Sequence, residues 1–462
     1  MKEYRVRKAR PVASELRPPG DPGISQRALL IAALANGPSV ISGFLPAEEC
    51  LHTIQACRAL GVAIDFLSDS DSASPWLPDE RDGSPGPTRL RVHGVSMNLK
   101  APSGAVDCCS SSTALGLLSG IVTGQPFTTR LRADGKVSRL SLQLLFQLLS
   151  SMGASIDAAG DSAPVTITGT QDLVPVHCES PADSLTKGAL LLAGLKASGK
   201  TAVTQSAGSN DHTERMLRHF QVKTQREGRT VSIFGGQMPE SRDVNVPGGI
   251  AYAAQWITAA AAQPGSDLVV RGAGLNDTRT GFLRVLLRMG ARVLEDIHPN
   301  SGGEPHGNVI VRGARLRATV IKQEEIAAVR DELPVLAVAA SLAQGKTVIH
   351  HPAEDAEFLA RIAHNLRLMG VAVSVSTGSI EITGSEGKPL QPGCVSSSGD
   401  IRIAMGFSIA GLFAEGETII EDTGCVDSVY HGFEDELRRF QDRSISEGIY
   451  TPVLAPVPAA KR

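Results

Sequence analysis

The stretch AALANGPSVISG, residues 32–43, holds the pattern that decides the fold of this chain. Small apolar residues run up to Gly37, and apolar and polar residues then alternate from Pro38 onward. Glycine after such a run is typical of a helix C-terminus, because glycine readily adopts the left-handed conformation found there. The alternation after it predicts a half-buried strand. The stretch therefore predicts the end of a buried helix followed at once by a strand.

The same pattern occurs six times, at a spacing of roughly 70–80 residues. The other copies are LLSGIVTGQPFTTRL from Leu117, LLLAGLKASGKTAVTQ from Leu190, AAAAQPGSDLVVRG from Ala259, AVAASLAQGKTVIHH from Ala337 and SIAGLFAEGETIIED from Ser408. A second helix ending in an MGA or MGV turn follows three copies, in LLSSMGASID, LLRMGARVLE and NLRLMGVAVS. We therefore expect an α/β (α+β) protein in which six units of strands and helices form two lobes of three.

Breaks in the pattern predict the boundaries between these parts. The segment NVPGGIAY, residues 245–252, contains Pro-Gly-Gly and marks a crossing between lobes. Residues 67–88 are rich in Ser, Pro and Asp, which predicts a surface loop. Residues 446–462 offer little to bury, so we expect a flexible tail.

Composition narrows the class of protein. The chain is 42% hydrophobic and 20% charged, as in ordinary globular proteins, and its net charge of -3 gives no reason to expect a nucleic-acid partner. No apolar run reaches the roughly 18 residues that a membrane span needs, and the first ten residues lack a signal sequence. The 7 Cys are scattered without a CxxC motif, which predicts reduced thiols and no metal site. We expect a cytoplasmic protein without a cofactor, acting on a small molecule.

Several motifs resemble those of the enolpyruvyl transferases, from about residue 15 to residue 440. They are PGD..IS.RALL at 19–30, DC..S.TAL at 107–115, KGALLLAGL at 187–195, S.DHTERML at 209–217, GLN.TRTG at 274–281, DELPVLAVAA at 331–340 and D.RIAM at 400–405. The resemblance implies two inside-out α/β lobes, each of three βαββαβ repeats, closing over an interdomain cleft. It also implies that the lobes are 21–246, and 1–20 with 247–445.

The same resemblance implies a site for a hydroxylated ring that carries a carboxylate, such as shikimate or a derivative. Arg27 matches the family arginine that grips the ring carboxylate, and Asp331 matches the acid that faces the ring hydroxyls. Ser184 matches a serine that holds the ring phosphate. The other substrate-binding candidates are Gly23, Ser111, Asp183, Leu185 and Arg402.

The chain departs from the family at the positions that bind phosphoenolpyruvate. The replacing residues are Pro22 and Gly23 for Lys-Ser, Gly116 for arginine, Glu354 for lysine, Phe358 for arginine and Ile401 for histidine. A charge-assisted hydrogen bond contributes roughly 1.5–3 kcal/mol, so the loss of three would cost about 5–9 kcal/mol. Arg402 is retained. The resemblance therefore predicts a degenerate phosphoenolpyruvate site.

Three functions fit these expectations. The first is a dehydratase that removes water from the ring by 1,4-conjugate elimination. Such a dehydratase would act in a secondary-metabolite pathway that leads to cyclohexanecarboxylate-type units. Its candidate catalytic acids and bases are Asp331, Asp355 and Glu357. The second is a carboxyvinyl transferase on 3-phosphoshikimate or another hydroxyl acceptor, in which Arg132, Lys136 or Arg139 supplies replacement charge. The third is a non-catalytic protein that binds a ring metabolite. The lost cations favour the dehydratase.

Overall fold

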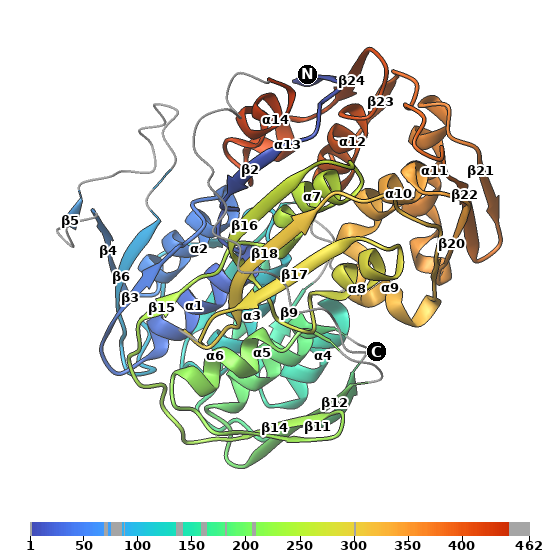
Figure 1. Cartoon of the computed structure of the whole chain (residues 1–462). Coiled ribbons are helices and arrows are strands. Elements are labelled where there is room, and N and C mark those ends of the chain that lie inside the picture. The colour runs from blue at the N-terminus through green and yellow to red at the C-terminus, as the bar shows by residue number, and fades with distance from the viewer. Residues whose placement is uncertain are drawn as a thin grey trace, which may run out of the picture.

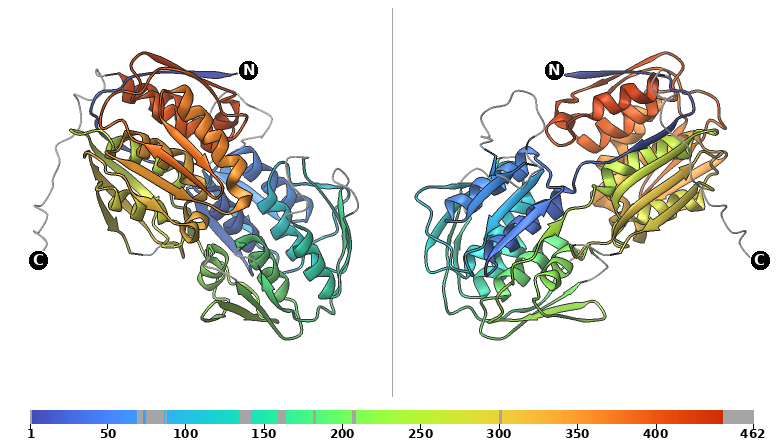
Figure 2. Two further views of the ribbon diagram at one scale, coloured as in Figure 1. Left: turned by 90° about the vertical axis from the view of Figure 1, so that its right-hand side faces the viewer. Right: turned by 60° about the vertical axis from the view of Figure 1, so that its left-hand side comes forward.

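The computed structural model describes residues 2–68, 73–74, 86, 88–134, 142–158, 164–180, 183–205, 209–299 and 302–442. Most of the predicted surface loop at 67–88 and all of the predicted tail at 446–462 lie outside these ranges. The described elements gather in two groups, which Figure 2 shows side by side.

The first group contains three mixed sheets, built by the residues between α1 and β15 (Figure 1). The first sheet has the order β15(Val244–Asn245)-β3(Pro38–Ser42)-β6(Arg89–His93)-β4(Ala63–Leu67)-β5(Ala73–Ser74). The second is β7(Val106–Asp107)-β8(Thr128–Arg132)-β10(Val165–Thr168)-β9(Ser155–Asp157), and the third is β11(His177–Ser180)-β12(Lys200–Gln205)-β14(Thr230–Phe234)-β13(Thr224–Glu227). Their helices are α1(Pro22–Leu34), α2(Glu48–Ala59), α3(Ser112–Thr123), α4(Gln143–Ser151), α5(Ser184–Gly194) and α6(His212–His219).

The second group contains the other three sheets and takes its first two strands from the N-terminus of the chain. Its sheets are β17(Arg292–Ile297)-β18(His306–Arg312)-β16(Asp267–Gly274)-β2(Ala13–Leu16), β19(Val320–Ile321)-β20(Lys346–His350)-β22(Ser379–Thr383)-β21(Val373–Ser376) and β1(Glu3–Arg7)-β24(Glu417–Glu421)-β23(Cys394–Ser396). Its helices are α7(Ile250–Ala261), α8(Gly281–Arg288), α9(Ile326–Val329), α10(Leu333–Leu342), α11(Ala356–Leu368), α12(Ile401–Gly411), α13(Gly424–Asp427) and α14(Phe433–Gln441), with short 3-10 turns at Gln323–Glu325, Arg330–Glu332 and Ala353–Asp355.

All six sheets share one pairing plan. In each, a parallel strand pair is extended by an antiparallel partner, for example β11 parallel to β12 and β12 antiparallel to β14. The strand that carries the alternating half of the quoted stretch, β3, is parallel to β15 and antiparallel to β6. The mixed α/β fold with repeated units is therefore confirmed, whereas the lobe boundaries at 21–246, and at 1–20 with 247–445, stay a prediction.

Six helices, one for each sheet, are buried along almost their whole length. They are α1, α3, α5, α7, α10 and α12. A helix that is apolar on all sides has to lie inside the protein, because no face of it suits water. Small residues let these helices approach closely: a Cβ at Gly120 of α3 would lie 2.2 Å from the carbonyl oxygen of Ala189 in α5.

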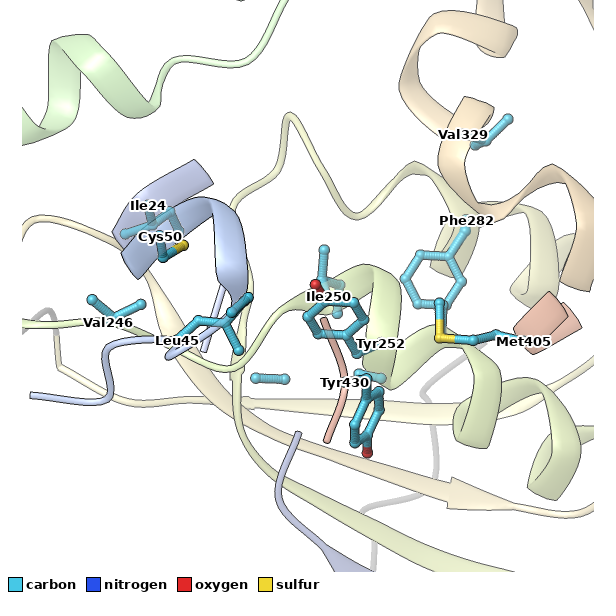
Figure 3. Close-up of a cluster of buried hydrophobic side chains, with 14 of the residues drawn as sticks. Ile24, Leu45, Cys50, Val246, Ile250, Tyr252, Phe282, Val329, Met405 and Tyr430 are labelled. Atoms are coloured by element: carbon cyan, nitrogen blue, oxygen red, sulfur yellow. The ribbon is translucent and has the colours of Figure 1, made fainter. Parts of the chain in front are cut away.

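The two groups meet through apolar and polar contacts. One continuous core cluster includes Ile24 from α1 as well as Tyr252 from α7, and Figure 3 shows the side chains around them. Beside it, the Nδ2 of Asn276 donates to Asp211, at 2.8 Å, and the Nδ1 of His212 lies 2.9 Å from Glu304. Buried polar side chains need such hydrogen-bond partners. These contacts therefore fix how the first group of elements packs against the second.

Candidate functional site

The N-termini of four buried helices carry polar capping side chains. Asp21 caps α1, Ser111 caps α3, Asp183 caps α5 and Asp400 caps α12, each by accepting backbone N–H hydrogen bonds. The N-terminus of a helix is the positive end of its dipole, so it favours acceptors and anions. These capped ends are where the predicted substrate-binding residues lie.

Arg27 lies in α1 and is buried, with 6% of its surface exposed. Its Nε donates to the hydroxyl of Thr213 at 3.0 Å, and its Nη1 donates to the carbonyl of Gly23 at 2.9 Å. Burial lowers the pKa of Arg27, and the charges of acids including Asp21 and Glu214 oppose that effect. The guanidinium is therefore held in a fixed position beside Gly23, and the substrate-binding role of both residues stays a prediction.

The other predicted residues of the first group cap or line α3 and α5. The hydroxyl of Ser111 accepts from Gln26, at 2.8 Å. Both carboxylate oxygens of Asp183 accept backbone N–H groups of α5, at 2.8 and 2.9 Å, and Ser184 is the first residue of that helix. Leu185 fills the space in front of Gly116, where a Cβ would lie 2.8 Å from its Cδ1. Leu185 and Gly116, which replaces a family arginine, are thus in direct contact.

Asp331 lies at the entrance of α10 between two arginines. Its Oδ2 accepts from Arg279 at 3.0 Å, and its Oδ1 lies 3.7 Å from Arg402. The side chain of Asp331 is 43% exposed, so it is open to a ligand despite these partners. The sequence predicted Asp331 and Arg402, and the structure brings them together. Arg279 lies within the family motif at 274–281, and the sequence did not mark it as a site residue.

Besides Asp331, two further groups hold Arg402. Its Nε and Nη2 donate to Asp400 at 3.0 and 2.7 Å, and its guanidinium lies 4.1 Å from the ring centroid of Phe358. A cation over an aromatic face is attracted by the ring quadrupole. The Phe358 that replaces a family arginine therefore serves as a platform for the arginine that remains.

Glu332 is a buried acid that the sequence did not single out. None of its side chain is exposed, and it lies 3.6 Å from Arg279. Burial raises the pKa of Glu332 to about 7, although the charge of Arg279 opposes this. A carboxyl with a pKa near neutrality changes its charge in the physiological range, which is a property of many functional sites. In the sequence, the position of Glu332 directly before the apolar run of α10 was the signal that this acid is buried.

The contacts of Asp355 and Glu357 differ from those of Asp331, which lies between Arg279 and Arg402. Asp355 is buried and accepts from Arg330 at 2.9 Å, and Glu354 lies 3.4 Å from the same guanidinium. Glu357 is exposed in the first turn of α11. The structure thus pairs Asp355 with Arg330, which also lies beside Glu354. The assignments of Asp355 and Glu357 as catalytic acids stay predictions.

Charges of the two groups influence one another at their junction. Tyr252, in the first turn of α7, is buried, and burial raises its pKa well above the ordinary value. The negative charges of Asp21 and Glu49 from the first group and of Asp331 from the second raise it further. The acids at the N-terminus of α1, in α2 and before α10 thus share in the electrostatic environment of one buried hydroxyl.

A second buried ion pair, also missed in the sequence, lies in the first group. The ammonium of Lys187 lies 2.6 Å from Glu214 and donates to the carbonyl of Asn210 at 2.9 Å. Of the three replacement cations, Arg132 pairs with Asp107 at the sheet edge. Lys136 and Arg139 lie outside the described residues.

Six mixed sheets around buried helices, with arginines and carboxylates gathered at the helix N-termini, define an α/β protein built from repeated units. The model of the family described as EPSP synthase (3-phosphoshikimate 1-carboxyvinyltransferase) matches residues 6–437. The chain belongs to the EPSP synthase family.

Similar proteins support this assignment over nearly the whole length. A 3-phosphoshikimate 1-carboxyvinyltransferase of Akkermansia muciniphila is 40% identical over 432 residues, covering 91% of this chain and 96% of that protein. One from Geobacter metallireducens is 37% identical over 441 residues, covering 94% and 98%. The EPSP synthase structure from Acinetobacter baumannii matches with a TM-score of 0.84 at 32% identity, covering 95% of this chain and 98% of that one.

These similarities overturn one expectation. The dehydratase interpretation, with its secondary-metabolite pathway, is wrong, because the full-length relatives carry the name of a carboxyvinyltransferase. The expected loss of the phosphoenolpyruvate site stays a prediction. Among the described residues, no helix is both long and apolar enough to cross a membrane.

Proposed function

We propose that this chain transfers the carboxyvinyl group of phosphoenolpyruvate to a hydroxyl group of 3-phosphoshikimate. The acceptor oxygen bonds to the central carbon of the enolpyruvyl group, and inorganic phosphate leaves. The observation that carries the proposal is the full-length similarity to enzymes named for this reaction. The cytoplasmic location expected from the sequence is part of the proposal.

The acceptor binds, in this proposal, between the helix N-termini of the first group and Asp331. Arg27, held by Thr213, pairs with the ring carboxylate, and Ser184 donates to the ring phosphate at the positive end of α5. Asp331 accepts the proton of the attacking hydroxyl. Its half-exposed position at the entrance of α10 supports this role, since the hydroxyl of a bound ligand can reach the carboxylate.

Arg402 and Arg279 bind the phosphate of phosphoenolpyruvate in this proposal. Both guanidiniums are already directed by Asp331, so little side-chain freedom is lost when a ligand binds. Charge-assisted contacts to the two arginines would contribute roughly 3–6 kcal/mol together. Arg402 is one of the retained family residues, so only the contact to Arg279, roughly 1.5–3 kcal/mol, offsets part of the loss that the substituted cations predict.

The test is the release of inorganic phosphate by the full chain with phosphoenolpyruvate and 3-phosphoshikimate, with the product identified by mass. Reactions without acceptor and with unphosphorylated shikimate show whether the ring phosphate is required. Arg402→Gln is expected to lower kcat/KM by roughly 10- to 100-fold. Arg438→Gln, an exposed change on α14, is the control that keeps the wild-type rate. Phosphate release no faster than without acceptor would refute the proposal.

A further inference from the structure

Three side chains of different chemistry converge between α2 and the loop that leads into α3. They are Glu48, His52 and Cys109, and their ligand atoms all lie within 4.8 Å of one another. Around a tetrahedral zinc ion, with bonds of about 2.0–2.3 Å, ligand atoms are about 3.2–3.8 Å apart. Side-chain rotation that brings the three ligand atoms closer by roughly an ångström would give the spacing of a zinc site.

The local structure accounts for this convergence. Glu48 and His52 are four residues apart at the start of α2, so they lie on one face of the helix. Cys109 follows β7, which packs against α2, and it has a left-handed backbone conformation with φ of 51°. The backbone N–H of Cys109 donates to Asp107 at 2.8 Å, and its carbonyl accepts from Asp134 at 2.9 Å. These bonds hold the cysteine in place opposite the helix.

We propose that Glu48, His52 and Cys109 form a site for a thiophilic divalent cation of the zinc type. Thiolate and imidazole ligands select zinc over magnesium or calcium, which prefer sets of oxygen ligands. On binding, the Cys109 thiol releases one proton to the solvent and the thiolate sulfur bonds to the metal. Three protein ligands leave the fourth position to water.

The surroundings of the site suit a cation. The carboxylate of Glu48 is exposed at the start of α2 and brings a negative charge that a divalent cation would offset. Glu48 is exposed and His52 is partly exposed, so an ion can reach these two ligands from solvent. Glu48 also lines a cavity of about 620 Å³, together with Gly43 and Asn245.

Metal binding would link the loop before α3 to helix α2. Cys109 is two residues from Ser111, which caps α3 and accepts from Gln26, the neighbour of Arg27. A metal bond would tie this loop to α2 and stabilise the folded chain by mass action, since the unfolded chain lacks the assembled site. This effect does not depend on the proposed reaction.

Cobalt binding to the full, untagged chain tests the site, because a cobalt–thiolate bond absorbs in the near ultraviolet. The wild type is expected to show this band with a single equivalent of Co²⁺, and to bind Zn²⁺ with a Kd of about 1 µM or tighter. Cys109→Ser is expected to abolish the band, whereas Cys394→Ser, which changes an exposed cysteine elsewhere, keeps it. A band that survives Cys109→Ser, or its absence from the wild type, overturns the proposal.

Two further measurements guard against a variant that simply fails to fold. His52→Ala changes a partly exposed side chain and is expected to weaken Zn²⁺ binding at least about tenfold, while His93→Ala, on β6, leaves it unchanged. Saturating Zn²⁺ is expected to raise the Tm of the wild type and not that of Cys109→Ser. Equal zinc affinity for His52→Ala and the wild type would also overturn the proposal.

Discussion

Replacement of Glu332 by glutamine should change how the stability of the chain depends on pH. Glu332 is fully buried, and its pKa is raised from 4.5 to about 7 in the folded protein. The folded state therefore holds this proton more tightly than the unfolded state. The stabilising contribution is fully present below about pH 4.5 and is lost as the pH rises through 7.

The size of the effect follows from the difference between the two pKa values. The shift from 4.5 to about 7 is roughly 2.5 units, and one unit corresponds to about 1.36 kcal/mol, so the full loss is roughly 3 kcal/mol. Most of it falls between pH 5 and pH 8. Glu332→Gln removes the titration, because the amide stays neutral at every pH in this range.

Urea unfolding of the wild type and of Glu332→Gln at pH 5 and pH 8 measures this directly. The variant is expected to gain roughly 2 kcal/mol relative to the wild type between the two pH values, whatever its stability at either one. Glu357→Gln, an exposed change on α11, should follow the wild type. Parallel pH profiles of the wild type and Glu332→Gln would refute the reasoning, because Arg279 would then keep Glu332 ionised throughout.

Gly120→Ala should lower the free energy of unfolding by about 1–3 kcal/mol in urea titrations, because its Cβ would collide with the backbone of α5. Gly104→Ala, whose Cβ would meet open space, should have little effect. Equal unfolding midpoints for the two variants would contradict this packing. Lys187→Met should destabilise the chain by about 3–5 kcal/mol, since it leaves Glu214 buried without its partner. The double variant with Glu214→Gln should recover part of that loss in the same titrations, and a double variant no more stable than the single one would argue against a coupled pair.

The sequence by itself determined the repeat and hence the class of fold. Each copy of the pattern quoted at residues 32–43 encodes a buried helix and the strand after it, and both signals are local in the chain. Helix ends and strand alternation depend on residues only a few positions apart, which is why they survive without tertiary information. The family motifs marked Arg27, Asp331 and Arg402 as candidate site residues, and their roles in binding or catalysis stay predictions.

Only the tertiary structure decided which charges act together. Arg279 and Asp331 are 52 residues apart, yet they form a hydrogen-bonded ion pair beside the buried Glu332. The dehydratase interpretation counted cations at matched positions and so left Arg279 out. Electrostatic interactions depend on distance and burial in the folded chain, not on separation along it. The spacing of Glu48 and His52 is visible in the sequence, but the fold alone brings Cys109 to them.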